Sequence, residues 1–102
     1  MKVITMEINK EFYINAMAEN LQMLRAKINL TQEELCYLAG VSRQTIVNVE
    51  RNKKLTWNTY LSLVFVFQNN KETSDLMSFL GIYPTELLRI LDKSIENERE
   101  LI

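Results

Sequence analysis

The 102-residue sequence contains no histidine and a single cysteine, Cys36. One cysteine cannot form a disulfide within the chain, and without histidine no plausible set of zinc ligands remains. No nucleophile lies beside a base, and no glycine loop suited to phosphates is present, so the sequence does not indicate an enzyme. We therefore expect no catalytic residue, no metal and no cofactor, and we interpret Cys36 as inert packing.

Glycine and proline are also scarce, and Gly40, Gly81 and Pro84 all fall at boundaries between helical patterns. Because no long stretch alternates with period two, the expected fold class is all-α. The longest apolar run, residues 60–67, is far shorter than the roughly 20 residues that cross a bilayer, so we expect no membrane partner. The first residues lack a signal-peptide pattern, which indicates a cytoplasmic protein.

Apolar spacing and capping residues predict six helices. The first covers about Tyr13 to Lys27, with an apolar stripe of Ile14, Met17, Leu21, Leu24 and Ile28. A capping box of Thr31 and Glu34 begins the second, Gln32 to about Ala39. Three N-terminal signals and one C-terminal signal mark the others: Ser42 begins a helix to about Arg51, Thr56 begins Trp57 to Gln68, Gly81 ends a short fifth helix and Pro84 begins the sixth.

The fourth of these helices is rich in large apolar residues. We expect them to form core, with a ligand pocket as the alternative. The residues are Trp57, Tyr60, Leu61, Val64, Phe65 and Phe67.

Charge is distributed unevenly along the chain, although the net charge is only −1. Residues 20–54 hold six basic and three acidic side chains, an excess of three positive charges. Residues 55–102 hold four basic and seven acidic side chains, an excess of three negative charges. This asymmetry indicates that the two parts have different tasks.

Two short helices joined at Gly40 are typical of a helix-turn-helix unit. Gly40 suits the tight turn, and Cys36 is small enough for a close approach of the two helices. Leu35, Ile46 and Val49 are expected to point inward. The outer face of the second helix then carries side chains that suit the edges of bases in double-stranded DNA, namely Arg43, Gln44, Val47 and Asn48.

Residues 21–68 contain "TQEEL", "AGVSRQTI" and "VERNK", with "LR" upstream. In these motifs the sequence resembles the Cro/C1-type, or XRE, family of transcription regulators. The resemblance implies a lambda-repressor-like domain in which Arg43, Gln44, Val47 and Asn48 read bases. It also implies contacts with the DNA backbone from Thr31, Gln32, Ser42, Asn52, Lys53 and Lys54.

The resemblance further implies a partly buried salt bridge between Arg25 and Glu50. Two departures from the family pattern stand out. Cys36 takes the place of the usual alanine, and Asn52 takes the place of the usual glycine after "VER", where we expect it to serve as a left-handed cap.

The expected organisation is an N-terminal arm (1–12), a DNA-binding domain (13–69) and a C-terminal helical appendage (70–102). An apolar stripe in the appendage either folds back or makes a homodimer through Leu87, Leu88, Leu91 and Ile95. The expected function is a dimeric repressor that reads a palindromic operator through the major groove. The alternatives are an antitoxin, which would also bind a toxin as its protein partner through the C-terminal segment, and a purely structural interaction module.

Overall fold

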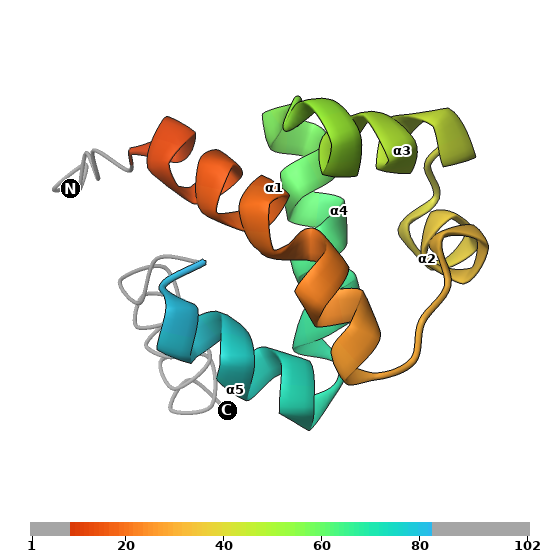
Figure 1. Cartoon of the computed structure of the whole chain (residues 1–102). Coiled ribbons are helices and arrows are strands. Elements are labelled where there is room, and N and C mark those ends of the chain that lie inside the picture. The colour runs from red at the N-terminus through yellow and green to blue at the C-terminus, as the bar shows by residue number, and fades with distance from the viewer. Residues whose placement is uncertain (1–8, 83–102) are drawn as a thin grey trace, which may run out of the picture.

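A computed structural model describes residues 9–82, which form five helices and no strand. The helices are α1 (Lys10–Lys27), α2 (Gln32–Ala39), α3 (Arg43–Asn52), α4 (Trp57–Gln68) and α5 (Lys71–Leu80). Figure 1 shows α1 crossing in front of α4, with α2 and α3 toward one edge of the molecule and α5 toward the opposite edge. The predicted all-α fold class is confirmed over these residues.

Several predictions concern parts of the chain outside the described residues, 1–8 and 83–102. These are most of the N-terminal arm, the sixth helix, the segment for a protein partner and the dimerisation residues Leu87, Leu88, Leu91 and Ile95.

Helix α1 begins at Lys10, three residues before the predicted start at Tyr13. The difference has a local cause, because the side chain of Asn9 accepts the backbone N–H of Phe12 at 3.1 Å and so caps the helix. The predicted boundary of an arm at residue 12 therefore falls inside α1. Of the predicted apolar stripe, Met17, Leu21 and Leu24 are fully buried, and Ile14 and Ile28 pack against the core from its edge.

Helix α4 lies at the centre of the domain and contacts α1, α2 and α5. The prediction that its large apolar residues all form core was wrong for Leu61 and Phe65, whose exposed fractions are 40% and 70%. The buried stripe is instead Tyr60, Leu63 and Phe67, at the three- and four-residue steps of a single helix face. Leu63 escaped prediction because seven of the eight residues 60–67 are apolar, which hides the helical period.

The side chain of Asn70 begins α5 by accepting the backbone N–H groups of Glu72 and Thr73. Gly81 ends the helix in a left-handed conformation, at φ 68°, as predicted. The chain then turns inward to Ile82, which is fully buried and whose carbonyl accepts the hydroxyl of Tyr60 at 2.7 Å. Because α5 packs on α1 and α4, residues 70–82 share one core with the helix-turn-helix part.

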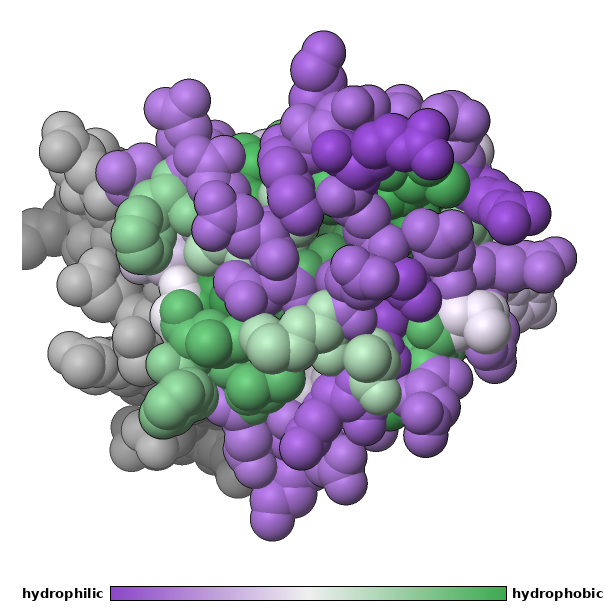
Figure 2. All heavy atoms as spheres, viewed as in Figure 1, coloured by the Kyte–Doolittle hydropathy of each residue, from purple (hydrophilic) through white to green (hydrophobic). Residues whose placement is uncertain are grey.

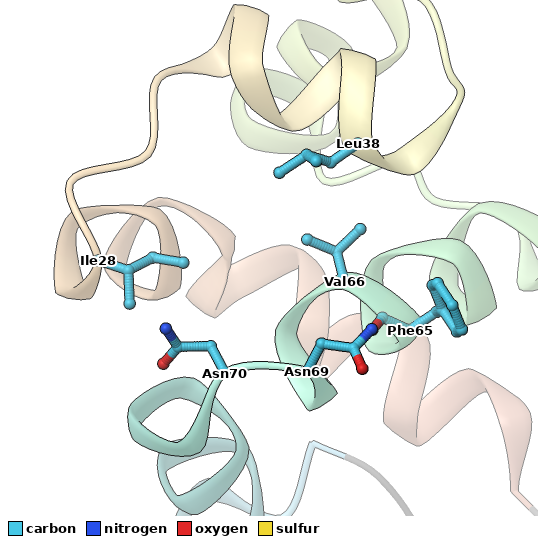
Figure 3. Close-up of a pocket in the computed structure, with 6 residues that line it drawn as sticks. All are labelled: Ile28, Leu38, Phe65, Val66, Asn69 and Asn70. Atoms are coloured by element: carbon cyan, nitrogen blue, oxygen red, sulfur yellow. The ribbon is translucent and has the colours of Figure 1, made fainter.

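An open hollow lies between α2 and the end of α4 (Figure 3). Val66 of α4 points toward Leu38 of α2 across it, Ile28 closes one side, and Asn69 and Asn70 form its floor. Phe65 also lines this hollow, but the other five residues predicted as core or pocket in α4 do not.

Candidate nucleic-acid interface

Helices α2 and α3 form the helix-turn-helix, and Figure 1 shows them crossing steeply, with α2 seen almost end-on and α3 side-on. Gly40 makes the turn in a left-handed conformation, at φ 69°, where a residue with a Cβ would be strained. Cys36 has 8% of its surface exposed and belongs to the same core cluster as the inward residues Ile46 and Val49 of α3. These packed side chains fix the orientation of α3 on the domain.

The outer face of α3 carries the side chains that were predicted to read bases. Arg43 and Gln44 in its first turn are exposed, whereas Val47 and Asn48 are half-buried. Successive residues of a helix are separated by about 100°, which places Gln44, Val47 and Asn48 opposite the buried side of the helix and Arg43 at the edge of this outer face. Figure 2 shows mainly hydrophilic atoms along the edge of the molecule where α3 lies, while apolar atoms gather in the region of α1 and α5.

Arg51 lies on this face as well, although it was not predicted to contact DNA. It is exposed, and it follows Gln44 by seven residues and Val47 by four, which places all three on one side of the helix. The same three- and four-residue spacing is present in the sequence and could have identified it.

Side-chain caps hold the beginnings of both helices. Thr31 Oγ1 accepts the N–H of Glu34 at 3.0 Å and Glu34 Oε1 accepts the N–H of Thr31 at 3.1 Å, which confirms the predicted capping box. Hydrogen bonds from the Thr31 backbone and hydroxyl lower the pKa of the Glu34 carboxyl. Ser42 Oγ accepts the N–H of Thr45 at 3.1 Å. These hydrogen bonds hold the hydroxyl oxygen of Thr31 at the N-terminus of α2 and that of Ser42 at the N-terminus of α3.

A network of charged and polar side chains joins α1, α2 and α3. Arg25 Nε lies 2.6 Å from Glu50 Oε2, and Arg25 Nη2 donates to Glu50 Oε1 at 2.8 Å, which makes the salt bridge bidentate. Arg25 Nη1 also donates to the carbonyl of Leu30 at 2.9 Å. The Arg25 and Glu50 side chains are only 14% and 11% exposed, so this pair is largely shielded from water.

Gln32, predicted to contact the DNA backbone, is part of this network. Its Nε2 donates to Glu50 Oε1 at 3.0 Å, so the first residue of α2 is tied to the second half of α3. Burial raises the pKa of the Glu50 carboxyl, but hydrogen bonds from Arg25 and Gln32 and the nearby positive charges outweigh burial, and the pKa falls below its ordinary value. The Glu50 hydrogen bond is the main cause of the raised pKa of Arg25.

The loop after α3 differs from the prediction in one residue. Asn52 was expected to be the left-handed cap, but it is the last residue of α3, and Lys53 is the cap, at φ 57°. The Lys53 N–H donates to the carbonyl of Val49 at 3.0 Å, which ends the helix one residue later than the sequence indicated. Lys53 and Lys54 are both exposed beside the outer face of α3.

Comparison with known proteins agrees with this geometry. A family model described as helix-turn-helix matches residues 21–56. The chain is also similar to an uncharacterized HTH-type transcriptional regulator of Archaeoglobus fulgidus, with 37% identity over 65 residues that cover 62% of this chain and 87% of the relative. This chain belongs to the Cro/C1-type helix-turn-helix family. No solved structure gives a significant match.

Membership of the Cro/C1-type family makes the chain a DNA-binding regulator of transcription. Within residues 9–82, no group of three metal-ligating side chains comes together, and no helix is long and apolar enough to span a membrane. The family match ends at residue 56. All of α4 and α5 therefore lies outside the match.

Proposed function

We propose that this chain is a dimeric, sequence-specific repressor that reads a palindromic operator through the major groove. The observation that carries the proposal is the division of α3 into two faces. Ile46 and Val49 are fully buried, while Arg43 and Gln44 are exposed in the first turn of the same helix. Arginine pairs with guanine and glutamine with adenine through two hydrogen bonds each, and Val47 can contact a thymine methyl group.

The DNA backbone is proposed to contact the ends of the two helices and the following loop. Thr31, Gln32 and Ser42 stand at helix N-termini, where backbone N–H groups and the helix dipole favour a phosphate. Asn52, Lys53 and Lys54 are exposed at the other end of α3. Contacts of this kind supply affinity and fix the register on DNA but carry no sequence information.

In this arrangement Gln32 has two tasks. Its amide nitrogen donates to Glu50, which leaves its backbone N–H at the start of α2 as the group for a phosphate. The Gln32–Glu50 hydrogen bond is proposed to fix the distance between this phosphate contact and the recognition helix, since it joins α2 to α3, and the Arg25–Glu50 salt bridge holds the Glu50 carboxylate in place for it.

The dimer interface is proposed to be the apolar stripe that contains Leu87, Leu88, Leu91 and Ile95. A symmetric dimer presents two recognition helices about 34 Å apart, so that they enter successive major grooves of a palindrome. Such a dimer covers a promoter site without any additional contact, which favours repression. The family is generally non-enzymatic, and we propose no catalytic activity for the chain.

Selection of bound sequences from a random pool of double-stranded DNA tests the proposal with the full chain. We expect enrichment of a palindrome whose half-sites are centred about one helical turn, or 10 base pairs, apart. Enrichment of a single, non-repeated half-site would contradict the dimer, and no enrichment even at low salt would contradict sequence-specific binding. A reporter placed behind the selected operator should then lose expression when the protein is present, whereas a gain would contradict repression.

A further inference from the structure

Three side-chain amides are joined by hydrogen bonds along α3. Gln44 Nε2 donates to Asn48 Oδ1 at 3.0 Å, and Asn52 Nδ2 donates to the same oxygen at 3.5 Å. The three residues are spaced by four, so each amide lies one helical turn from the next. Asn48 is the middle member, and its oxygen serves both neighbours.

These bonds leave Gln44 and Asn48 with different capacities for a base. A side-chain amide offers two N–H donors and an oxygen with two lone pairs. Asn48 uses both lone pairs on its neighbours, so only its NH₂ group remains for DNA. Gln44 uses a single N–H and keeps both an acceptor and a donor. Adenine presents a donor and an acceptor side by side, so an amide that pairs with it must offer a free acceptor and a free N–H together. The Gln44 amide has both groups free, and the Asn48 amide does not.

The same distinction holds if all three amides are rotated by half a turn. Asn48 would then donate both hydrogens to Gln44 and Asn52 and keep only its oxygen. Gln44 would still hold one lone pair and two N–H groups, which is enough for adenine. The middle position of Asn48, rather than the direction of the bonds, therefore decides which residue can pair with adenine.

The placement of the two side chains agrees with this distinction. Gln44 is exposed in the first turn of α3, where a recognition helix enters the groove. Asn48 is half-buried and lines a small groove with Thr56 and Thr59, at the beginning of α4. Asn48 is rotated by about 40° from Gln44, toward α4 and away from the centre of the outer face.

We propose that Gln44 is the adenine-reading residue of the recognition helix and that Asn48 is a positioning residue, which holds the Gln44 amide, rather than an independent reader of a base. This inference rests on the proposed DNA-binding function and replaces the expectation that Asn48 reads a base itself. A glutamine side chain held in place before binding loses less conformational freedom on DNA. Ordering one such side chain changes affinity by roughly 2- to 12-fold.

The test is the same random-pool selection, carried out with the full wild-type chain, Gln44→Ala, Asn48→Ala and the double variant. Gln44→Ala should abolish the adenine preference at one position of each half-site, a loss of roughly 5- to 150-fold in discrimination. Asn48→Ala should weaken the preference at that same position by about 2- to 12-fold and leave the other positions unchanged. The double variant should match Gln44→Ala there.

Two controls accompany these variants. Arg43→Ala should relax a different position. Asn52→Ala leaves the Gln44–Asn48 bond in place and removes a proposed phosphate contact, so it should weaken binding to all sequences alike and keep the adenine preference. Thermal unfolding of every variant establishes that it is folded. A merely structural role of Asn48 would lower affinity for all sequences equally and leave every preference intact, which would overturn the inference.

The inference is also overturned if Asn48→Ala relaxes a second position, or if the two losses add in the double variant. In either case the wild-type motif still stands, so the proposed function survives. A wild-type chain that enriches no sequence overturns the proposed function and, with it, this assignment of Gln44 and Asn48.

Discussion

Replacing either member of the Arg25–Glu50 pair with alanine should destabilise the fold strongly. The two side chains share a bidentate contact at 2.6 and 2.8 Å and are almost shielded from water. Removing Arg25 leaves a carboxylate in this site with Gln32 as its remaining hydrogen-bond donor. Removing Glu50 leaves a guanidinium whose remaining bond is to the carbonyl of Leu30. In both variants the surviving charge has lost the counter-charge to which it was hydrogen-bonded.

The magnitude follows from the burial of the pair. Removing one partner of a fully buried ion pair costs about 3–5 kcal/mol, because the other charge stays desolvated. Since 14% and 11% of these side chains remain exposed, water can reach the survivor, and we expect about 2–4 kcal/mol for each single variant. In a domain of this size each kcal/mol lowers the midpoint of thermal unfolding by roughly 4–8 °C.

The double variant should cost less than the sum of the single variants, with a coupling energy of about 1–3 kcal/mol, because no unpaired charge remains. Urea unfolding followed by far-ultraviolet circular dichroism measures all four corners of the cycle. Lys27→Ala in α1 and Glu33→Ala in α2 are matched controls, since both side chains are exposed and each change should cost under about 0.5 kcal/mol. Additive losses, or losses no larger than the controls, would refute the reasoning.

Four further predictions follow from the same contacts. Because the pKa of Glu50 is lowered below its ordinary 4.5 in the folded state, its contribution to stability should be complete above that pH and should disappear as the pH falls through the lowered value. The stability difference between wild type and Glu50→Gln, measured by unfolding across this range, should therefore shrink in acid, and a difference that grows would contradict the assignment. Thr31→Ala should cost about 0.5–2 kcal/mol in urea unfolding by removing the cap of α2, and an unchanged midpoint would show that the capping box contributes nothing. Lys53→Ala and Lys54→Ala should weaken binding to operator and random DNA alike and should each lower the salt slope by about one, whereas a change in the preferred sequence would exclude a pure phosphate contact. A chain that ends at residue 83 should stay helical, because Ile82 and its bond to Tyr60 are retained, yet dimerise and bind operator more weakly; light scattering that shows an unaltered dimer would rule out the C-terminal stripe as the interface.

Much of the domain was predictable because its signals are local. Capping residues three positions before their partners identified the beginnings of α2, α3 and α4, and the glycines at 40 and 81 identified two left-handed ends. The stripe of α1 and the inward positions of α3 were predictable because each of these helices alternates apolar and polar faces. The family motifs indicated the Arg25–Glu50 pair, which the structure shows, and the assignment of α3 as the helix that reads bases stays a prediction.

The features that the sequence did not predict are those for which two or more similar side chains could take the same place in the fold. In α4 seven of the eight residues 60–67 are apolar, so the pattern could not separate the buried Leu63 from the exposed Phe65. The cap of α3 fell on Lys53 rather than Asn52, because the helix extended by one residue despite the higher tolerance of asparagine for the left-handed region. The hydrogen bond of Gln32 to Glu50 joins two helices, so only the fold determines it, whereas the partners of Asn48 lie four residues away in the same helix and were present in the sequence as a spacing.

The most direct test of the central claim, that the outer face of α3 reads DNA, is a comparison of the sequences selected from a random pool by the wild-type chain and by Arg43→Ala. The exposed Arg43 is proposed to read one guanine per half-site. The variant should therefore retain the palindrome but lose its preference at one position of each half-site, with about 1–3 kcal/mol less affinity for the wild-type operator. An identical selected sequence bound with unchanged affinity would contradict the assignment of α3 as the helix that reads bases.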